Sequence, residues 1–330
     1  MRAKGDQDAM GIRDFISVVR ELSFEQLRAE ALLAPRVLVV ARDQDTARAC
    51  RDLIFGANTE EYVQLHASGE APPDPLGFDV VVSVGPLDLA TSRTWRDLFR
   101  RVDEPVRVVE VDPRLLQGHG SVDDVRKRIA DVADERSLAL GRYIDAMREA
   151  CAIQTVGSTA AVNAQFALLS NLPTVLPVVG NLVAVGADFL VLTKNQLMMI
   201  YKLAAIYQRD LDDRWRIYQE MIPVVGSGLV WRTVAREIAG LMPLAMGTVP
   251  KVAIAYAGTY AIGRAAHYYY EHGTRLDRSD MRALYEEALT LLRRNPLPFS
   301  RDGSPPTSPR EALDQAGDRP TPGQGQSEPQ

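Results

Sequence analysis

The residues best placed to do chemistry are Arg42, Asp43, Asp45 and Arg48, which follow the apolar run 37–41. A phosphate-binding loop at such a place needs glycines, whose backbone N–H groups wrap the oxygens, together with a lysine and a Ser or Thr that holds Mg²⁺. The stretch after the run has neither glycine nor lysine. Its carboxylates would repel a phosphate, although they suit the positive end of a helix as caps. We therefore expect a domain with no bound nucleotide, no metal, no other cofactor and no catalytic residue.

The elements that position this stretch follow from three apolar runs, each of the kind that a buried parallel strand shows. The runs are 37–41, 78–84 and 106–111, with a weaker strand at 62–65 and helical stretches at 46–55 and 91–101. Alternating strands and helices predict an α/β fold with a doubly wound parallel sheet.

The strand, turn and helix that end in Phe55 and Gly56 resemble the small Era-like GTPases. Those proteins carry a Gly-x-x-x-x-Gly-Lys-Ser loop before a helix that ends in Leu-Phe-Gly. In that register Ala41 and Thr46 replace the two glycines, Ala47 replaces the lysine and Arg48 replaces the Ser or Thr. The resemblance implies a degenerate P-loop GTPase-like domain without activity.

Two later motifs of that family are also altered. The stretch 66–69, His-Ala-Ser-Gly, stands where the family has Asp-x-x-Gly and lacks the acid. The stretch 109–112 stands where the family reads guanine with Asn-Lys-x-Asp, and only Asp112 is kept. Asp112 and Arg48 are thus weak remnants of a nucleotide site. One alternative is a degenerate but active switch that uses Arg42 or Arg48 for phosphate and Asp112 for the base.

Composition shifts along the chain predict five parts. They are N-terminal helices at 1–34, the α/β domain at 35–120, a linking helix at 121–150, a helical domain at 151–295 and a tail at 296–330. The first part includes an amphipathic helix at 12–22 and a second helix that Ser23 opens. Ser121 and Asp124 cap the linking helix. The tail is rich in Pro, Gly, Ser and Gln and cannot bury enough apolar surface to order itself.

The helical part contains the stretch 171–193, which approaches the ~20 apolar residues that span a bilayer. Pro173, Pro177, Asn181 and Asp188 would each be costly in lipid unless neighbouring helices satisfy them. A membrane-inserted helix, a buried or re-entrant hairpin and a soluble bundle therefore all stay open.

Other segments share this character. The segments 221–231 and 241–250 are also interrupted by Pro and Gly, while 252–266 is rich in Gly and Ala, which let helices approach closely. Aromatic and basic residues flank these runs, as they do where a chain meets lipid headgroups: Lys194, Tyr201, Lys202, Trp231, Arg232, Lys251 and Tyr268 to Tyr270.

Five motifs in this part occur in a recognisable order: Asn163-Ala, Leu172-Pro-x-x-Leu-Pro177, 192–200 with its Thr-Lys-Asn-Gln core, 205–207, and 257–265 with Thr-Tyr-Ala-x-Gly-Arg. Over residues 150–294 this order resembles the uncharacterised YcjF-like domain of bacterial membrane proteins, which also follows Era-like GTPase domains. The resemblance implies a bacterial, membrane-associated and GTPase-linked protein, and it supplies no catalytic residues.

The remaining candidates favour structural roles. His267 and His272 flank Glu271 at a spacing that does not put two imidazoles on one helix face, so we expect surface residues. Ser158 and Thr159 have no partnered histidine nearby in sequence, which gives no support to hydrolase chemistry.

Asp188, Lys194 and Asn195 lie beside apolar helices. They suit a buried polar cluster that fixes helix register, the alternative being a contact for lipid or a partner.

A net charge of -5 and a pI near 5.5 argue against nucleic-acid binding. Two distant cysteines and a polar N-terminus favour a reducing setting without a secretory signal. We therefore expect a non-catalytic scaffold at the cytoplasmic face of the bacterial cytoplasmic membrane. Its expected partners are membrane lipid and a protein, either a GTPase or a second copy. The alternatives are the nucleotide switch and a soluble regulatory helical bundle.

Overall fold

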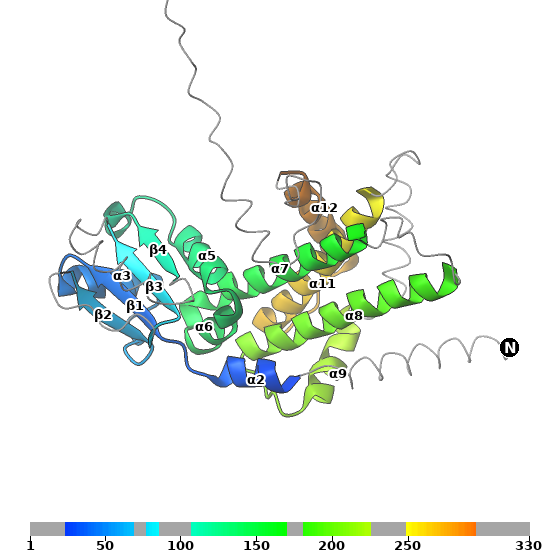
Figure 1. Cartoon of the computed structure of the whole chain (residues 1–330), viewed down its shortest axis with the longest axis horizontal. Helices are drawn as coiled ribbons and strands as arrows, with labels where there is room; N and C mark the ends of the chain where they lie inside the picture. The colour runs from blue at the N-terminus through cyan, green and yellow to red at the C-terminus, as the bar shows by residue number, and fades with distance from the viewer. Residues whose placement is uncertain (1–23, 69–76, 86–106, 170–180, 226–248, 295–330) are drawn as a thin grey trace, which may run out of the picture.

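The computed structural model describes residues 24–68, 77–85, 107–169, 181–225 and 249–294. A parallel sheet lies at one end of this part and long helices lie at the other (Figure 1). The prediction of an α/β sheet followed by helices is confirmed in this coarse form. The predicted helices at 12–22 and 91–101 and the predicted tail at 296–330 lie outside the described residues.

The sheet has four parallel strands in the order β2-β1-β3-β4. The strands are β1 (Val37–Ala41), β2 (Val63–Ala67), β3 (Val80–Val84) and β4 (Val108–Val111). All four predicted strands are present, with bounds that move by up to two residues. After β1 the chain passes to one side for β2 and then to the other side for β3, so the crevice where such folds bind ligands lies beside the carboxyl end of β1.

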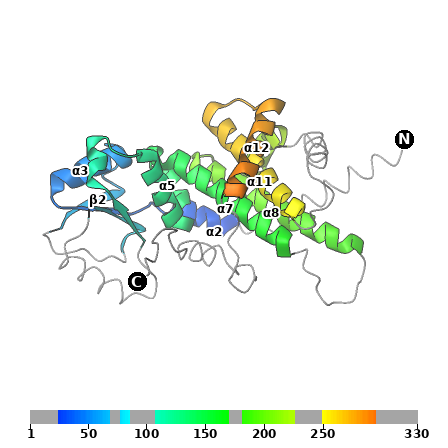
Figure 2. The ribbon, with the colours of Figure 1, turned by 90° about the horizontal axis from the view of Figure 1, so that it is seen from above.

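Two helices cover one face of the sheet, α3 (Gln44–Ile54) and α5 (Val122–Ala133) (Figure 2). The side chains of β1 alternate between this face and the opposite one, where Leu38 and Val40 cluster with Val81. Every residue of β1 is buried. Burial on both faces is why this strand is a continuous apolar run.

The segment 121–150 is not the single linking helix that its pattern predicts. Ser121 does cap α5, since its Oγ accepts from the Asp124 N–H at 3.1 Å. Asp134 then takes φ +52°, which stops the helical hydrogen-bond pattern. The chain continues as η3 (Asp134–Arg136), α6 (Ser137–Tyr143) and η4 (Asp145–Met147).

The helical half consists, in its described part, of α7 (Arg148–Leu169), α8 (Asn181–Ile206), α9 (Arg214–Val225), α11 (Val249–His272) and α12 (Arg278–Arg294). α7, α8 and α11 pack against one another, and α12 packs on α11 (Figure 1). The N-terminal helix α2 (Phe24–Leu32) lies against α6 and α8.

Among the described helices, none is both long enough and apolar enough to cross a bilayer. Residues 171–180 of the first predicted apolar segment lie outside the described ranges, as do 226–231 and 241–248 of the next two.

The guanidinium of Arg136 connects the sheet, the end of α2 and the segment before α6. Arg136 donates from Nε to Asp79 Oδ1 at 2.8 Å and from Nη2 to Asp79 Oδ2 at 3.2 Å, just before β3. The same guanidinium donates to the carbonyls of Glu30 and Leu33, at 3.3 and 3.1 Å, which end α2. Asp79 Oδ2 also accepts from the Arg36 N–H at 2.8 Å. Arg136 therefore fixes α2, the sheet and α6 relative to one another.

Close packing adds to this junction. One cluster of buried apolar side chains continues from the sheet through α5 and α6 into α7, α8 and α11. A Cβ at Gly141 of α6 would lie 2.9 Å from Cys151 Cβ and 3.0 Å from Ile206 Cγ2. The absence of a side chain at Gly141 is what lets α6 approach both α7 and α8.

Replacing Arg136 with Met should lower the free energy of unfolding by about 2–4 kcal/mol, because it leaves the largely buried Asp79 carboxylate without its cation. Urea unfolding of the full chain would measure the change. The control is Arg114→Ala, which removes an ion pair to Asp112 that is half exposed or more on both sides and should leave the stability almost unchanged. Equal effects of the two substitutions would contradict the role given to Arg136.

Candidate functional site

The turn after β1 is shorter than the phosphate loop of a P-loop protein. Only Arg42 and Asp43 separate β1 from α3, so Thr46, Ala47 and Arg48 already lie inside the helix. A phosphate loop needs a longer segment, with backbone N–H groups that point inward around the anion.

The N-terminus of α3 is occupied by the chain's own carboxylate. Asp43 is the N-cap residue, and its Oδ1 accepts from the Thr46 N–H at 2.8 Å. This backbone hydrogen bond holds the pKa of Asp43 below its ordinary value, so the carboxylate is charged at neutral pH. The backbone N–H that would donate to a phosphate oxygen at this helix N-terminus therefore already donates to a carboxylate.

The residues predicted as remnants of a nucleotide site, Asp112 and Arg48, are paired with their neighbours, as is Arg42. Asp112 accepts from the Arg114 side chain at 2.6 Å and from its backbone N–H at 2.9 Å, which lowers the pKa of Asp112 to about 2. Arg48 contacts Asp45 at 3.2 Å and Arg42 contacts Asp43 at 3.3 Å. His66 lies buried on β2, whereas Gly69 lies outside the described residues.

A second group of polar side chains lies between α7, α8 and α11. Asn163 Nδ2 donates to Thr259 Oγ1 at 2.8 Å, and Asn195 Nδ2 donates to Asn163 Oδ1 at 2.7 Å. Gln196 Nε2 also reaches Thr259 Oγ1, at 3.3 Å. Asn163 and Thr259 are buried, so these bonds satisfy groups that water does not reach.

This network brings together residues from three of the motifs that carry the YcjF-like resemblance. Asn195 behaves as the predicted register-fixing cluster requires. Lys194 is instead exposed on α8, and the side chain of Asp188 lies outside the described part. Ser158 and Thr159 bond the Thr155 carbonyl, at 3.2 and 2.8 Å, as ordinary helix hydroxyls do.

One helical turn beyond Thr259, the same face of α11 carries Gly263. A Cβ there would lie 2.6 Å from Val156 Cγ2 of α7 and 2.9 Å from Met199 Sδ of α8. The absence of a side chain at Gly263 therefore lets the three helices approach closely at this position.

A further turn along, His267 corrects the expectation of a surface histidine, because it is 4% exposed. Its Nδ1 lies 2.8 Å from the Tyr207 hydroxyl, and its Nε2 lies 3.5 Å from Glu271 Oε2. Burial lowers the pKa of His267 to about 4, so the ring is neutral at pH 7. His272 is exposed, as expected.

The sequence reasoning did not find Arg136 or the contact between Tyr207 and His267. A local signal existed for the second, since Thr259, Gly263 and His267 recur every four residues and so share one helix face. Arg136 gave no such signal, because its partners lie far away in the chain.

No protein-family profile matches the chain, and neither a curated protein nor a solved structure matches it significantly. The resemblances to Era-like and YcjF-like domains therefore stay predictions from motifs.

Gly263→Ala should lower the free energy of unfolding by about 1–3 kcal/mol, because the added methyl overlaps Val156 and Met199. Gly157→Ala on α7 is the matched control. Its added methyl meets nothing within 4 Å, so the higher helix propensity of Ala should raise stability by about 0.5–1 kcal/mol. Thermal and urea unfolding would measure both, and a neutral Gly263→Ala variant would show that the helices are not packed this closely.

Proposed function

We propose that this chain is a non-catalytic scaffold: its sheet half binds a protein partner, and its helical half associates with the cytoplasmic face of a bacterial membrane. The observation that carries the non-catalytic part is the Asp43 carboxylate on the Thr46 N–H, after a turn of two residues. A phosphate could take that place only by displacing the cap, which would destabilise the start of α3, and it would still lie near two carboxylates.

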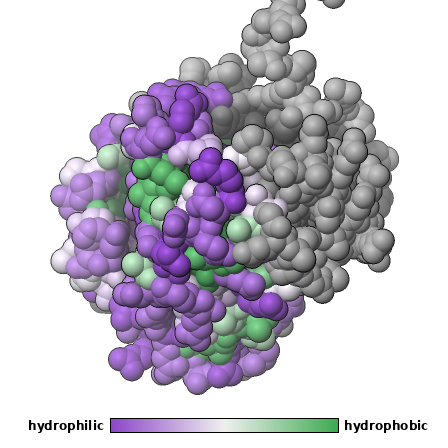
Figure 3. All heavy atoms as spheres, turned by 90° about the vertical axis from the view of Figure 1, so that its left-hand side faces the viewer, coloured by the Kyte–Doolittle hydropathy of each residue, from purple (hydrophilic) through white to green (hydrophobic). Residues whose placement is uncertain are grey.

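The protein-binding part of the proposal is supported by the surface of the sheet half. Apolar side chains interrupt the polar surface at this end of the molecule (Figure 3). Leu53 of α3 and Val108 of β4 are each more than a third exposed. With polar groups around them, exposed apolar side chains suit a modest protein contact. The YcjF-like resemblance favours a GTPase as the partner, and a second copy is the alternative.

The membrane part of the proposal is supported by the sequence of the helical half. Aromatic and basic residues flank its apolar segments, and small residues such as Gly263 let its helices pack as membrane helices do. The buried polar groups of Asn163 and Thr259 bond each other, so they add no unpaired polar group if lipid lies outside the bundle.

The full chain should bind GTP, GDP and ATP with Mg²⁺ only weakly, with Kd above about 1 mM, because the helix N-terminus already holds an anion. Isothermal titration and a fluorescent nucleotide analogue would measure this. Micromolar binding that disappears in Asp112→Ala would establish the alternative of a degenerate switch and reject the scaffold as stated.

On fractionation of bacteria that express it, the full chain should sediment with membranes and stay there after a high-salt wash, since apolar contact does not weaken with ionic strength. Carbonate extraction then separates an inserted chain, which stays in the pellet, from one held at the surface, which is released. Recovery in the soluble fraction before any wash would instead favour the soluble regulatory bundle.

A further inference from the structure

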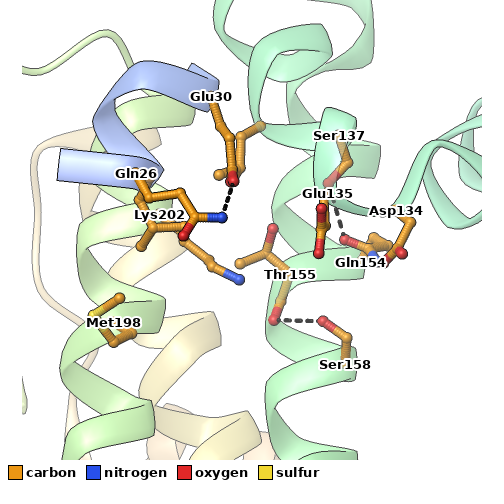
Figure 4. A pocket seen from close by; sticks show the side chains of 12 residues that line it. Gln26, Glu30, Asp134, Glu135, Ser137, Gln154, Thr155, Ser158, Met198 and Lys202 are labelled. Atoms are coloured by element: carbon orange, nitrogen blue, oxygen red, sulfur yellow. Dashed lines mark hydrogen bonds between the residues drawn. The ribbon is translucent and has the colours of Figure 1, made fainter. Parts of the chain in front are cut away.

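A polar cavity of about 250 Å³ lies between α2, the segment that follows α5 and the first helices of the helical half. Its walls come from α2, η3, α6, α7 and α8, so segments far apart in the chain meet around one space (Figure 4). Water takes about 30 Å³ per molecule in the liquid, so the cavity has room for a ligand of roughly eight to ten non-hydrogen atoms. The function proposed above makes no use of this space.

The cavity is lined by separate charges that do not neutralise one another. Lys202 extends from α8 toward the space, Glu30 enters from α2, and Asp134 and Glu135 come from η3 (Figure 4). Among the described residues, no ion pair involves any of these four side chains. Three carboxylates and one ammonium leave the lining with a local charge of −2.

Neutral side chains also contribute hydrogen-bonding groups to this lining. Gln26 Nε2 donates to Glu30 Oε1 at 2.8 Å, which holds that carboxylate at the rim. Ser137 Oγ donates to Gln154 Oε1 at 3.2 Å. The amide nitrogen of Gln154, which lies on α7, is therefore left to donate to a ligand. The cavity therefore offers donors from Lys202 and Gln154 and negative charge from α2 and η3.

We propose that this cavity binds a free basic α-amino acid, with the α-carboxylate on Lys202 and Gln154 and the ammonium groups on Glu30, Asp134 and Glu135. A ligand of this class carries one negative group, which suits the two donors, and two positive groups, which suit the carboxylates, so it complements the lining in sign. Charge-assisted hydrogen bonds of this kind are about twice as strong as neutral ones.

Other ligands fit the lining less well. An inorganic anion would meet three carboxylates, and a diamine without a carboxylate would leave Lys202 facing positive charge. In the described part of the chain no group of His, Cys, Asp or Glu has the arrangement to hold a metal ion. The lining thus selects for a carboxylate and two cations on one small molecule.

Because of where the cavity lies, a bound ligand would affect the contacts that Arg136 makes. Asp134 and Glu135 directly precede Arg136, which bonds the Glu30 carbonyl and Asp79. A ligand that bridges α2, η3 and α8 strengthens the same junction, so occupancy raises the stability of the native chain.

The test compares L-lysine with cadaverine, the same molecule without the carboxylate, by thermal shift and calorimetry on the full chain. L-Lysine should raise Tm by several degrees when present at about 100 times Kd, and cadaverine should bind at least about tenfold more weakly. L-Glutamate should bind more weakly still. No shift with L-lysine, or equal binding of L-lysine and cadaverine, would overturn the proposal.

Lys202→Met keeps the aliphatic stem and should remove the preference for L-lysine over cadaverine. Lys194→Met, on an exposed position of the same helix, should leave it intact. Glu135→Gln changes an exposed side chain that is not needed for folding, and it should weaken L-lysine binding by about tenfold or more even if Lys202→Met does not fold. Unchanged affinity in Glu135→Gln would reject the assignment of the ammonium groups.

Discussion

The arrangement of this molecule depends on where one arginine is placed. A continuous helix through 121–150 would carry Arg136 past the sheet, whereas the break at Asp134 turns it back onto Asp79 and the end of α2. A non-glycine residue at positive φ costs of order 1–3 kcal/mol. The bonds that Arg136 makes to one carboxylate and to α2 carbonyls offset that strain, since hydrogen bonds to charged groups contribute about 1.5–3 kcal/mol each.

Beyond that junction, the register of the helices is set by polar and small residues rather than by large apolar side chains. Along α11, Thr259 bonds α7, Gly263 leaves room for α7 and α8, and His267 bonds Tyr207, which directly follows α8. A shift of α11 by one helical turn would break all three contacts at once and leave buried polar groups without hydrogen-bond partners. Because these groups face one another, the same packing is compatible with water or lipid outside the bundle.

The sequence predicts the local features of this fold well. β1 is found because a strand buried on both faces has an uninterrupted apolar run, and the caps Asp43 and Ser121 are found because their side chains act on the next helical turn. Two features could not be found. The break at Asp134 is decided by Arg136 partners up to 106 residues away, and the burial of His267 is decided by another helix.

The Asp43 cap also limits how this chain can respond to its surroundings. In folds that sense a nucleotide, the helix N-terminus is vacant until a phosphate arrives, so its charge state reports the ligand. A covalently attached carboxylate with a lowered pKa is present throughout the neutral range, so the negative charge at the N-terminus of α3 is constant across that range. In a scaffold of the kind proposed above, a signal would therefore have to enter elsewhere. The cavity beside Arg136 is lined by charges that form no ion pairs, and the ligand proposed for it would strengthen the contacts among α2, η3 and α8.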